Sequence, residues 1–460
     1  MKTDLVVRDC RVVTPGGVVP CTLAVQEGRV AAVFGPGESP DARRTLDAGG
    51  RYVLPGLLDT HVHLGNGEFS FASDCATESR MAVAGGVTTL MPFIIARGSY
   101  LEDLPAKRRA VEEHSLVDML FHVAVVREEQ IDEIPEIAGR FGVRSFKAFM
   151  AYKGREVSPS GIQGMGDAEI FTVFQRVARL SNALAIVHCE NMEIIELCQR
   201  PFMSAGRQDT AAWSDSRPVF GELEAIRRMV CFAEAAGIRF LVPHMGIGLG
   251  SEFLRRKTWG AARVAVETCP HYLALDKDAD RGVAGKVNPP LRGRDQIAAL
   301  WQRLTDGTID VVGSDHCPYT RKAKGTDLWT SRPGVPGGTA MILPVLLTEG
   351  IHKGRVTWPQ LAALTSTNAA RLFGLYPRKG ALEVGSDADL VVVDDDREVT
   401  VDTRTLHTAA DFTPYEGYVS RGWAGVTVAG GQVAYEAGEV VLEQRRARVL
   451  APDGASPAGA

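Results

Sequence analysis

The chain has little cysteine and no long apolar run. Its eight cysteines among 460 residues form no CxxC pair, which argues against a thiolate-rich structural metal site and against a disulfide framework. No apolar stretch reaches the roughly 18 residues of a transmembrane helix, and no apolar region follows the basic start of the chain. We therefore expect a cytoplasmic protein with reduced, mostly buried thiols.

An excess of positive charge is also absent. The chain has 51 Lys and Arg against 56 Asp and Glu, for a formal net charge of -5. This balance argues against nucleic acid or an anionic membrane surface as a partner. A hydrophobic content of 45% is typical of a globular protein, and the length is sufficient for an α/β barrel with an additional small domain.

Short alternating strands separated by turns occur at both ends of the chain. The run Leu5–Val13 is followed by a Thr-Pro-Gly-Gly turn, and a second strand-rich region follows residue 380. We predict that residues 1–52 and 380–448 form one small β-sandwich domain. Residues 449–460 are rich in Pro, Gly, Ser and Ala, which predicts a disordered tail.

Between these ends, apolar strands alternate with helical segments, a pattern that predicts βα units and a parallel sheet. We therefore predict an α/β fold class with a (β/α)8, TIM-like barrel over residues 53–379. A doubly wound open sheet is the alternative. The eight predicted strands end near His63, Pro92, Val126, Met150, Cys189, His244, Cys269 and Asp315.

Metal-capable side chains stand where several of these strands end. His61 and His63 follow an apolar run at a spacing of two, which points both imidazoles to one side of a strand. His188, His244 and Asp315 end three further strands, and the carboxyl ends of barrel strands meet at one face. Any one of them alone would be an ordinary structural residue. Together they predict a catalytic metal site, and nitrogen and oxygen ligands suit Zn²⁺, Mn²⁺, Fe²⁺ or Co²⁺.

Lys147 lies among apolar residues in the run Phe146–Met150. Such a lysine is often a snorkelling side chain or one half of a buried ion pair. If two metals are present, a neutral lysine can react with CO₂ to give a carbamate whose oxygens bridge both ions. Burial beside dications lowers the lysine pKa and favours that neutral form.

Taken together, several motifs resemble the amidohydrolase superfamily, and within it the cyclic amidases: hydantoinases and dihydropyrimidinases, allantoinases and dihydroorotases. The resemblance covers nearly the whole chain. The motifs are Pro55–His63, Phe146–Tyr152, Val187–Asn191, Pro243-His244, Asn288–Arg292, Gly313–Pro318 and Gly385–Leu390.

The resemblance implies two divalent metal ions, most often Zn²⁺, and a role for each motif. The buried metal would be held by His61, His63 and Asp315. The more exposed metal would be held by His188 and His244, with carboxylated Lys147 bridging the two. A hydroxide shared by the metals would attack the amide, and Asp315 would act as base and then as acid.

The resemblance also implies residues that contact the substrate. Tyr152 would donate to the oxyanion, and Asn288 would bind the cyclic amide. The loop Gly334–Gly338 would add backbone contacts, and from its position after His63 we expect the segment Asn66–Ser73 to form part of the pocket. The family further implies a homodimer or homotetramer.

The substrate is less well defined than the chemistry. The first motif of dihydroorotases has the pattern His-x-His-x-Arg. This chain differs from that pattern, because it has Gly65 at the arginine position. The segment Phe149–Tyr152 favours hydantoinase or dihydropyrimidinase, whereas Glu267–Tyr272 and Asn288–Pro290 are more similar to allantoinases and dihydroorotases. We predict hydrolysis of a C–N bond in a hydantoin or dihydropyrimidine ring. The alternatives are allantoinase, then dihydroorotase or a non-catalytic assembly protein related to dihydropyrimidinases.

Overall fold

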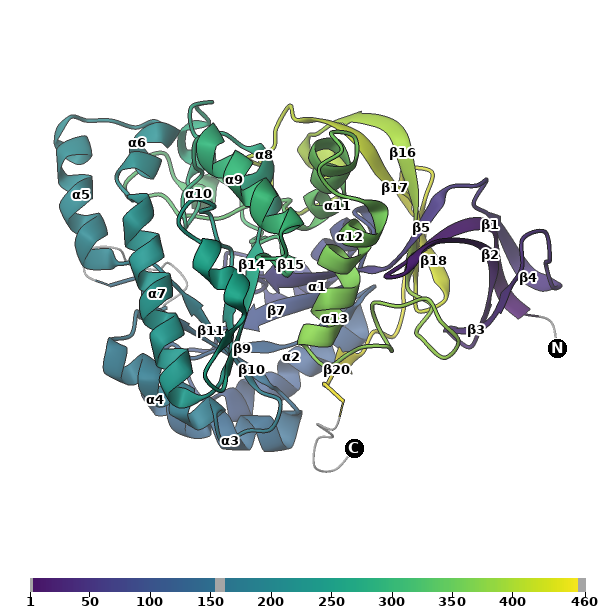
Figure 1. Ribbon diagram of the computed structural model, residues 1–460, viewed down its shortest axis with the longest axis horizontal. Coiled ribbons are helices and arrows are strands. Elements are labelled where there is room, and N and C mark those ends of the chain that lie inside the picture. Colours follow the sequence, from purple (N-terminus) through teal and green to yellow (C-terminus); the bar gives the residue numbers. More distant parts are fainter. Residues whose placement is uncertain (1–2, 154–161, 454–460) are drawn as a thin grey trace.

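Two sheets organise the part of the chain that the structure describes, residues 3–153 and 162–453 of a computed structural model (Figure 1). A nine-stranded, mainly antiparallel sheet lies at one end of the molecule. An eleven-stranded, mainly parallel sheet and its helices make up the rest. No helix among the described residues is long and apolar enough to cross a membrane.

Eight parallel strands pair in chain order within the larger sheet, from β6 to β15. An isolated parallel bridge between Val62 and His316 then brings the first strand beside the segment that follows the last. Each strand ends within three residues of its predicted position. The strands are β6 (Leu57–Val62), β7 (Val87–Ile94), β9 (His122–Ala124), β10 (Ser145–Phe149), β11 (Leu184–His188), β12 (Arg239–Val242), β14 (Ala262–Thr268) and β15 (Val311–Val312).

Helices separate these strands and pack their apolar faces on the sheet. The helix α7 ends at Gly237, whose φ of 67° is the left-handed conformation that glycine adopts readily at a helix end. The longer helices are α1 (Phe71–Ala84), α2 (Tyr100–His114), α3 (Glu129–Phe141), α4 (Asp167–Val177), α5 (Met192–Ser204), α7 (Val219–Ala236) and α9 (Arg294–Thr305). The shorter ones include α6 (Thr210–Asp215), α8 (Pro270–Ala274), α10 (Arg321–Lys324), α11 (Ile342–Val345), α12 (Trp358–Ala362), α13 (Asn368–Leu372) and α14 (Thr403–Leu406).

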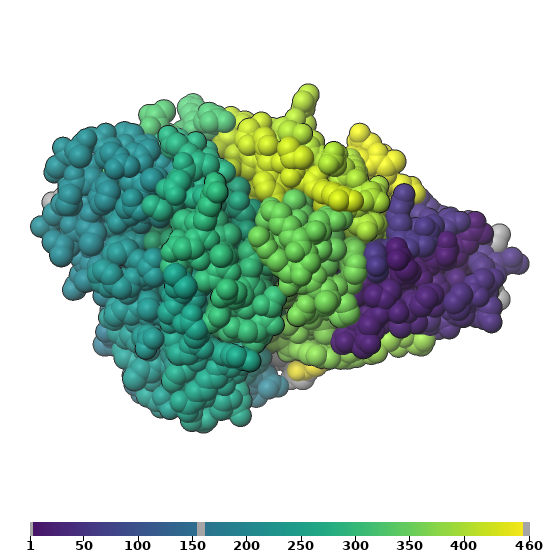
Figure 2. All heavy atoms as spheres, turned by 45° about the horizontal axis from the view of Figure 1, so that its top comes forward, coloured from purple at the N-terminus to yellow at the C-terminus, as the bar shows by residue number. Residues whose placement is uncertain are grey.

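The nine-stranded sheet combines both ends of the chain, as Figures 1 and 2 show by the purple and yellow segments that meet at one end of the molecule. In its centre, β5 pairs with β16 in an antiparallel register that joins Leu54 to Val391. Buried apolar side chains of this sheet form a hydrophobic cluster of their own, separate from the main core. Its strands are β1 (Thr3–Thr14), β2 (Gly17–Gln26), β3 (Arg29–Phe34), β4 (Ala42–Asp47), β5 (Tyr52–Pro55), β16 (Leu390–Thr400), β17 (Val419–Ala429), β18 (Gln432–Glu436) and β19 (Glu439–Val440).

The terminal sheet is fixed to the first helix of the larger unit. Trp423 and Thr427 of β17 donate hydrogen bonds to the carbonyl oxygens of Ala84 and Val83, at 2.9 and 2.7 Å. Carbonyl groups in the last turn of a helix lack the regular intrahelical partner, and that of Val83 also accepts a hydrogen bond from the backbone N–H of Gly86 at 3.2 Å. The sheet therefore supports α1, which follows directly on the strand that carries His61.

The predicted disordered tail at 449–460 is wrong for its first residues. Val449 and Leu450 form a short strand, β20, parallel to Met119 and Leu120 of β8 (Asp118–Leu120). The sequence gives no periodic signal for a two-residue strand, and the segment is held by charge as well as by pairing. Residues 454–460 lie outside the described residues.

That charge is the buried carboxylate of Asp118. Lys379 Nζ lies 2.8 Å from it, and Arg445 and Arg448 lie at 2.9 and 2.5 Å. Burial alone would raise the pKa of Asp118, but the three cations outweigh burial and hold that pKa well below its ordinary value. One carboxylate thus joins the start of β8, the segment before β16 and the segment before β20.

Replacing this carboxylate is expected to destabilise the fold. Asp118→Asn removes the carboxylate that pairs with the buried Arg445, while Lys379 and Arg448 keep ion pairs with Asp387. Leaving a buried charge without its partner costs about 3–5 kcal/mol of unfolding free energy. Because the folded pKa is depressed, the carboxylate stabilises the protein above its unfolded pKa of about 4, and this contribution is lost as pH falls through the folded value. Urea unfolding from pH 7 to pH 3 would test both points. A variant as stable as the parent at pH 7 would contradict the expectation.

Candidate active site

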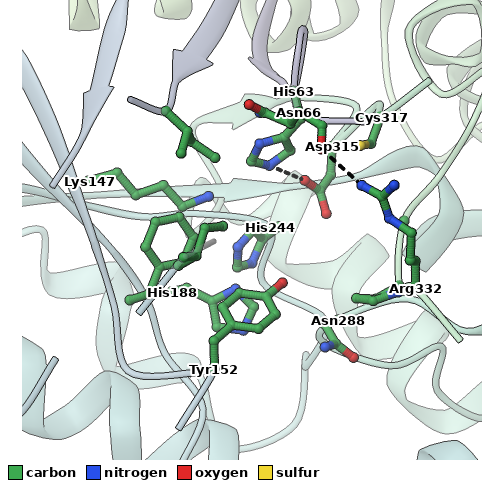
Figure 3. A pocket seen from close by; sticks show the side chains of 15 residues that line it. His63, Asn66, Lys147, Tyr152, His188, His244, Asn288, Asp315, Cys317 and Arg332 are labelled. Atoms are coloured by element: carbon green, nitrogen blue, oxygen red, sulfur yellow. Dashed lines mark hydrogen bonds and ion pairs between the residues drawn. The ribbon is translucent and has the colours of Figure 1, made fainter. Parts of the chain in front are cut away.

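Seven of the eight residues predicted from the sequence line one pocket at the carboxyl ends of the parallel strands (Figure 3). The eighth, His61, is fully buried beneath it, where its ring nitrogen lies 2.8 Å from Lys147 Nζ. Strands β6, β10, β11, β12 and β15 each deliver at least one of the metal-capable side chains. The seven are His63, Lys147, Tyr152, His188, His244, Asn288 and Asp315.

His61, His63 and Asp315 form the tightest group. Asp315 Oδ1 lies 3.1 Å from His63 Nε2 and 3.3 Å from His61 Nε2. One ligand atom from each of the three residues falls within 4.8 Å of the others. Two imidazole nitrogens and one carboxylate oxygen converging on one point form a donor set that suits a divalent metal.

His188 and His244 form a second group beside the first. Their ring centroids are 4.6 Å apart, and that of His244 lies 5.0 Å from that of His61. Both ring nitrogens of His244 are buried without a hydrogen-bond partner among the described residues. A buried polar atom without a partner is costly, so a metal ligand is a natural role for this imidazole.

Burial keeps the histidines in the form that binds metals. It lowers the pKa of His63 and takes the pKa values of His61 and His244 well below the ordinary value. Burial opposes ionisation of Asp315 as well, but the hydrogen bond from His63 keeps the pKa of Asp315 below its usual range. His61, His63 and His244 therefore favour the neutral imidazole and Asp315 the carboxylate, which are the ligating forms.

Lys147 lies between the two groups and is almost completely buried. Burial lowers the pKa of its ammonium to about 8, although Asp315 and Glu267 oppose that shift. Among the described residues no carboxylate lies within ion-pair distance of its Nζ, which instead sits 4.2 Å from the centroid of the Phe93 ring. A lysine in this setting has an accessible neutral form, and only the neutral amine reacts with CO₂.

The donor set therefore fits two divalent cations. The one thiol that lines the pocket, Cys317, stays neutral because burial raises its pKa to about 12. The remaining candidate ligands are imidazoles and oxygen atoms, and the imidazole of His244 has no hydrogen-bond partner among the described residues.

Tyr152 and Asn288 occupy the outer part of the pocket. Tyr152 follows β10 with a φ of 63°, unusual for a bulky residue, and its ring lies 6.1 Å from that of His188. Figure 3 shows its hydroxyl directed into the pocket. Asp315 and His244 also have positive φ values, 54° and 35°. Backbone strain of this kind concentrates at functional sites, where the surrounding structure maintains it.

The segment Asn66–Ser73 contributes less than the sequence suggested. Asn66 lines the pocket, but Phe71 begins α1 and packs in the core, 6.1 Å from the ring of Phe121. An aromatic residue after a loop can begin the next helix as readily as it can face a ligand. In the other predicted loop, Gly334 lines the pocket together with its neighbour Pro333.

The Amidohydrolase family matches residues 52–433, which include every metal-capable residue of the site. The chain belongs to the amidohydrolase family.

Similar amidohydrolases match along almost the whole chain. The L-hydantoinase of Paenarthrobacter aurescens is 34% identical over 455 residues, 96% of each protein. The allantoinase of Rubrobacter xylanophilus is 35% identical over 445 residues, 95% of each protein. The solved structure of an L-hydantoinase (dihydropyrimidinase) from Arthrobacter aurescens has a TM-score of 0.87 and 32% identity, and covers 97% of this chain and 99% of that one.

Two buried carboxylates, which the sequence pattern did not indicate, orient two of the histidines of this amidohydrolase. Glu267 Oε1 lies 2.7 Å from His61 Nδ1 and accepts a hydrogen bond from the backbone N–H of His244. Glu190 Oε2 lies 2.7 Å from His188 Nε2, and its other oxygen pairs with Arg217 at 2.9 Å. Each carboxylate engages one ring nitrogen and leaves the other for a metal, an arrangement common in metalloproteins.

Removing one of these carboxylates is expected to weaken metal binding. Glu267→Gln should reduce metal affinity or activity about 10- to 100-fold, because His61 loses a charged partner that fixes its ring. Chelator competition followed by metal analysis would measure the loss, with the exposed Glu234→Gln as the matched control. Unchanged affinity in Glu267→Gln would contradict the orienting role.

Proposed function

We propose that this amidohydrolase uses two divalent metal ions, Zn²⁺ first among them, to hydrolyse a C–N bond of a cyclic amide in a hydantoin or dihydropyrimidine ring. The observation that carries the proposal is the convergence of four imidazoles, Lys147 and Asp315 around one pocket. Relatives named L-hydantoinase and D-hydantoinase support this branch of the family.

For the fold of the chain, we infer that the eight parallel strands close into a (β/α)8 barrel and that the terminal sheet folds into a small β-sandwich domain. The Val62–His316 bridge and the solved hydantoinase structures support this. The domain boundaries at 52/53 and 379/380 stay predictions, as does assembly into a homodimer or homotetramer.

In the proposed mechanism, His61, His63 and Asp315 would hold one cation, His188 and His244 would hold the other, and carboxylated Lys147 would be a ligand to both. Such cations polarise an amide carbonyl and make water nucleophilic near neutral pH. Asp315 accepts the proton of the attacking water and delivers it to the departing ring nitrogen. Tyr152 donates to the oxyanion that develops on the carbonyl, and Asn288 orients the ring.

A substrate panel tests the proposal. Metal-loaded protein would be assayed with hydantoin, 5-substituted hydantoins of both hands, dihydrouracil, allantoin and dihydroorotate. Turnover of hydantoins or dihydrouracil that is lost in Lys147→Ala and Asp315→Ala supports it. Absence of bound metal in protein purified without chelator would instead favour a non-catalytic assembly role.

Allantoin hydrolysis is the second candidate, because an allantoinase is as similar in sequence as the hydantoinases are. Allantoin contains the same five-membered ring as hydantoin, with two amide-type nitrogens, so the metal chemistry would be the same. Turnover of allantoin alone in the panel would select this candidate.

The role of Tyr152 has its own test. Tyr152→Phe is expected to lower kcat about 100-fold with little change in KM, since a hydrogen bond to the oxyanion forms fully only in the transition state. Steady-state kinetics on the best substrate would measure it, with Tyr376→Phe, which lies outside the pocket, as control. A change in KM alone would contradict oxyanion stabilisation.

A further inference from the structure

Arg332 brings a permanent positive charge to the wall of the active-site pocket. It lies in the loop between α10 and the 3-10 turn Thr339–Met341, and it lines the pocket together with Asn288 and Asp315. Its side chain is half-buried. Figure 3 shows the guanidinium directed into the pocket, on the side opposite Lys147. The proposed hydrolysis of a neutral amide bond assigns this cation no role.

The contacts of Arg332 hold the guanidinium in place without neutralising it. Its Nη2 donates a hydrogen bond to the backbone oxygen of Asn66 at 2.9 Å, and its Cζ lies 4.9 Å from the centroid of the Tyr319 ring. Among the described residues, no carboxylate lies within 4.0 Å of it. Since a guanidinium has five N–H donors, most of its hydrogen-bonding capacity remains for another group.

The nearby acidic residues are engaged elsewhere. Asp315 pairs with His63 at 3.1 Å, and Glu68 accepts hydrogen bonds from the backbone N–H and hydroxyl of Thr320. The other cation that contacts the Tyr319 ring, Lys324, is fully buried, and burial holds its pKa well below the ordinary value. Arg332 is therefore the group on this loop that presents a fixed charge to the pocket.

Part of the pocket lining is apolar. Ile95, Phe149 and Ile162 belong to one hydrophobic cluster, line the pocket and offer no side-chain hydrogen-bonding group. A ring substituent directed towards Arg332 would meet a planar donor that matches a carboxylate, whereas one directed towards the isoleucines would meet hydrocarbon. The pocket thus distinguishes charged from apolar substituents by position.

We propose that Arg332 binds a carboxylate on the ring or its short substituent, so that the preferred substrates are anionic cyclic amides. This inference rests on the proposed cyclic amide hydrolysis and specifies its substrate class. Arg332 brings its guanidinium to the pocket that the metal-capable residues also line.

A pair of matched substrates tests the proposal: 5-carboxymethylhydantoin and its primary amide, which has nearly the same shape without the charge. We expect kcat/KM of the metal-loaded enzyme to be about 10- to 100-fold higher for the carboxylate, as a charge-assisted hydrogen bond implies. Arg332→Gln should abolish that preference, mainly through KM, and leave the amide substrate within about threefold. Arg332→Lys should restore part of it, because it keeps the charge but not the planar pair of donors.

The exposed Arg321→Gln in α10, the helix that precedes this loop, is the matched control and should keep the parent preference. An equal loss for both substrates in Arg332→Gln would mean that Arg332 only supports the loop, and it would overturn the inference. A parent enzyme that prefers the amide would overturn it as well.

Calorimetric binding of the same two compounds separates this inference from the proposed function. The parent protein could bind the carboxylate more tightly than the amide and lose this preference in Arg332→Gln, with no hydrolysis of either compound. That result would support the anion site and reject cyclic amide hydrolysis. Hydrolysis of both compounds, with equal affinity in the parent and Arg332→Gln proteins, would reject the anion site alone.

Discussion

Asp315→Asn is expected to lower kcat about 10³- to 10⁴-fold on whichever cyclic amide the parent enzyme hydrolyses. Proton transfer by a positioned carboxylate contributes up to about 10⁴-fold, and an amide cannot accept the proton. The carboxylate also lies 3.1 Å from His63 and 3.3 Å from His61, so its loss weakens the group of ligands that it completes. Steady-state kinetics and metal analysis on the same preparation would measure both effects.

Metal content decides how the Asp315 result is interpreted. Loss of activity with both metals retained would assign proton transfer to Asp315, whereas loss of one metal would place ligation first. The matched control is Asp278→Asn, whose side chain is 65% exposed on the surface. Activity of Asp315→Asn within tenfold of the parent would be incompatible with either role.

Lys147→Met is expected to reduce bound metal from two ions to at most one per chain and to lower kcat/KM by about 10³-fold or more. Methionine fills a similar volume but cannot form a carbamate, so no bridging anion offsets the repulsion between two cations. Metal ions supply several kcal/mol of transition-state stabilisation, and each 1.36 kcal/mol is tenfold in rate. Metal analysis and kinetics would measure the two losses together.

A direct measurement of the modification complements this substitution. The native mass of the parent should exceed the sequence mass by one CO₂ and two metals, and labelled CO₂ should give a carbamate carbon signal that Lys147→Met lacks. The exposed Lys353→Met is the matched control. Two metals bound to a parent without added CO₂ mass would show that Lys147 bridges in another way or not at all.

The sequence predicted the strands and the strand-end residues well, because both depend on local pattern. A buried strand has an apolar run, and His61, His63, His188 and Asp315 each follow such a run at a carboxyl end. The pocket gathers His63, His188 and Asp315, with His61 buried beneath it, because parallel strands place their carboxyl ends at one edge.

The features that the sequence did not predict depend on contacts between residues that are far apart in the sequence. Glu267 orients His61 from 206 positions further along the chain, and its own neighbours give no sign of that contact. Arg332 lies in a loop without periodicity, so its approach to the pocket could not be predicted. The strand β20 was missed for the same reason, because its anchor Asp118 lies about 330 positions earlier.

The pairing of β5 with β16 has a consequence for how the protein is made. Leu390 pairs with Pro55, so this edge of β5 stays uncovered until Leu390 has been synthesised and has left the ribosome. At a translation rate of about 5 to 20 residues per second, the wait is roughly 20 to 70 s. During that time the strand that precedes His61 and His63 carries an open edge, and open strand edges favour aggregation. We therefore expect the yield of active enzyme in a heterologous host to rise with added chaperones or faster elongation.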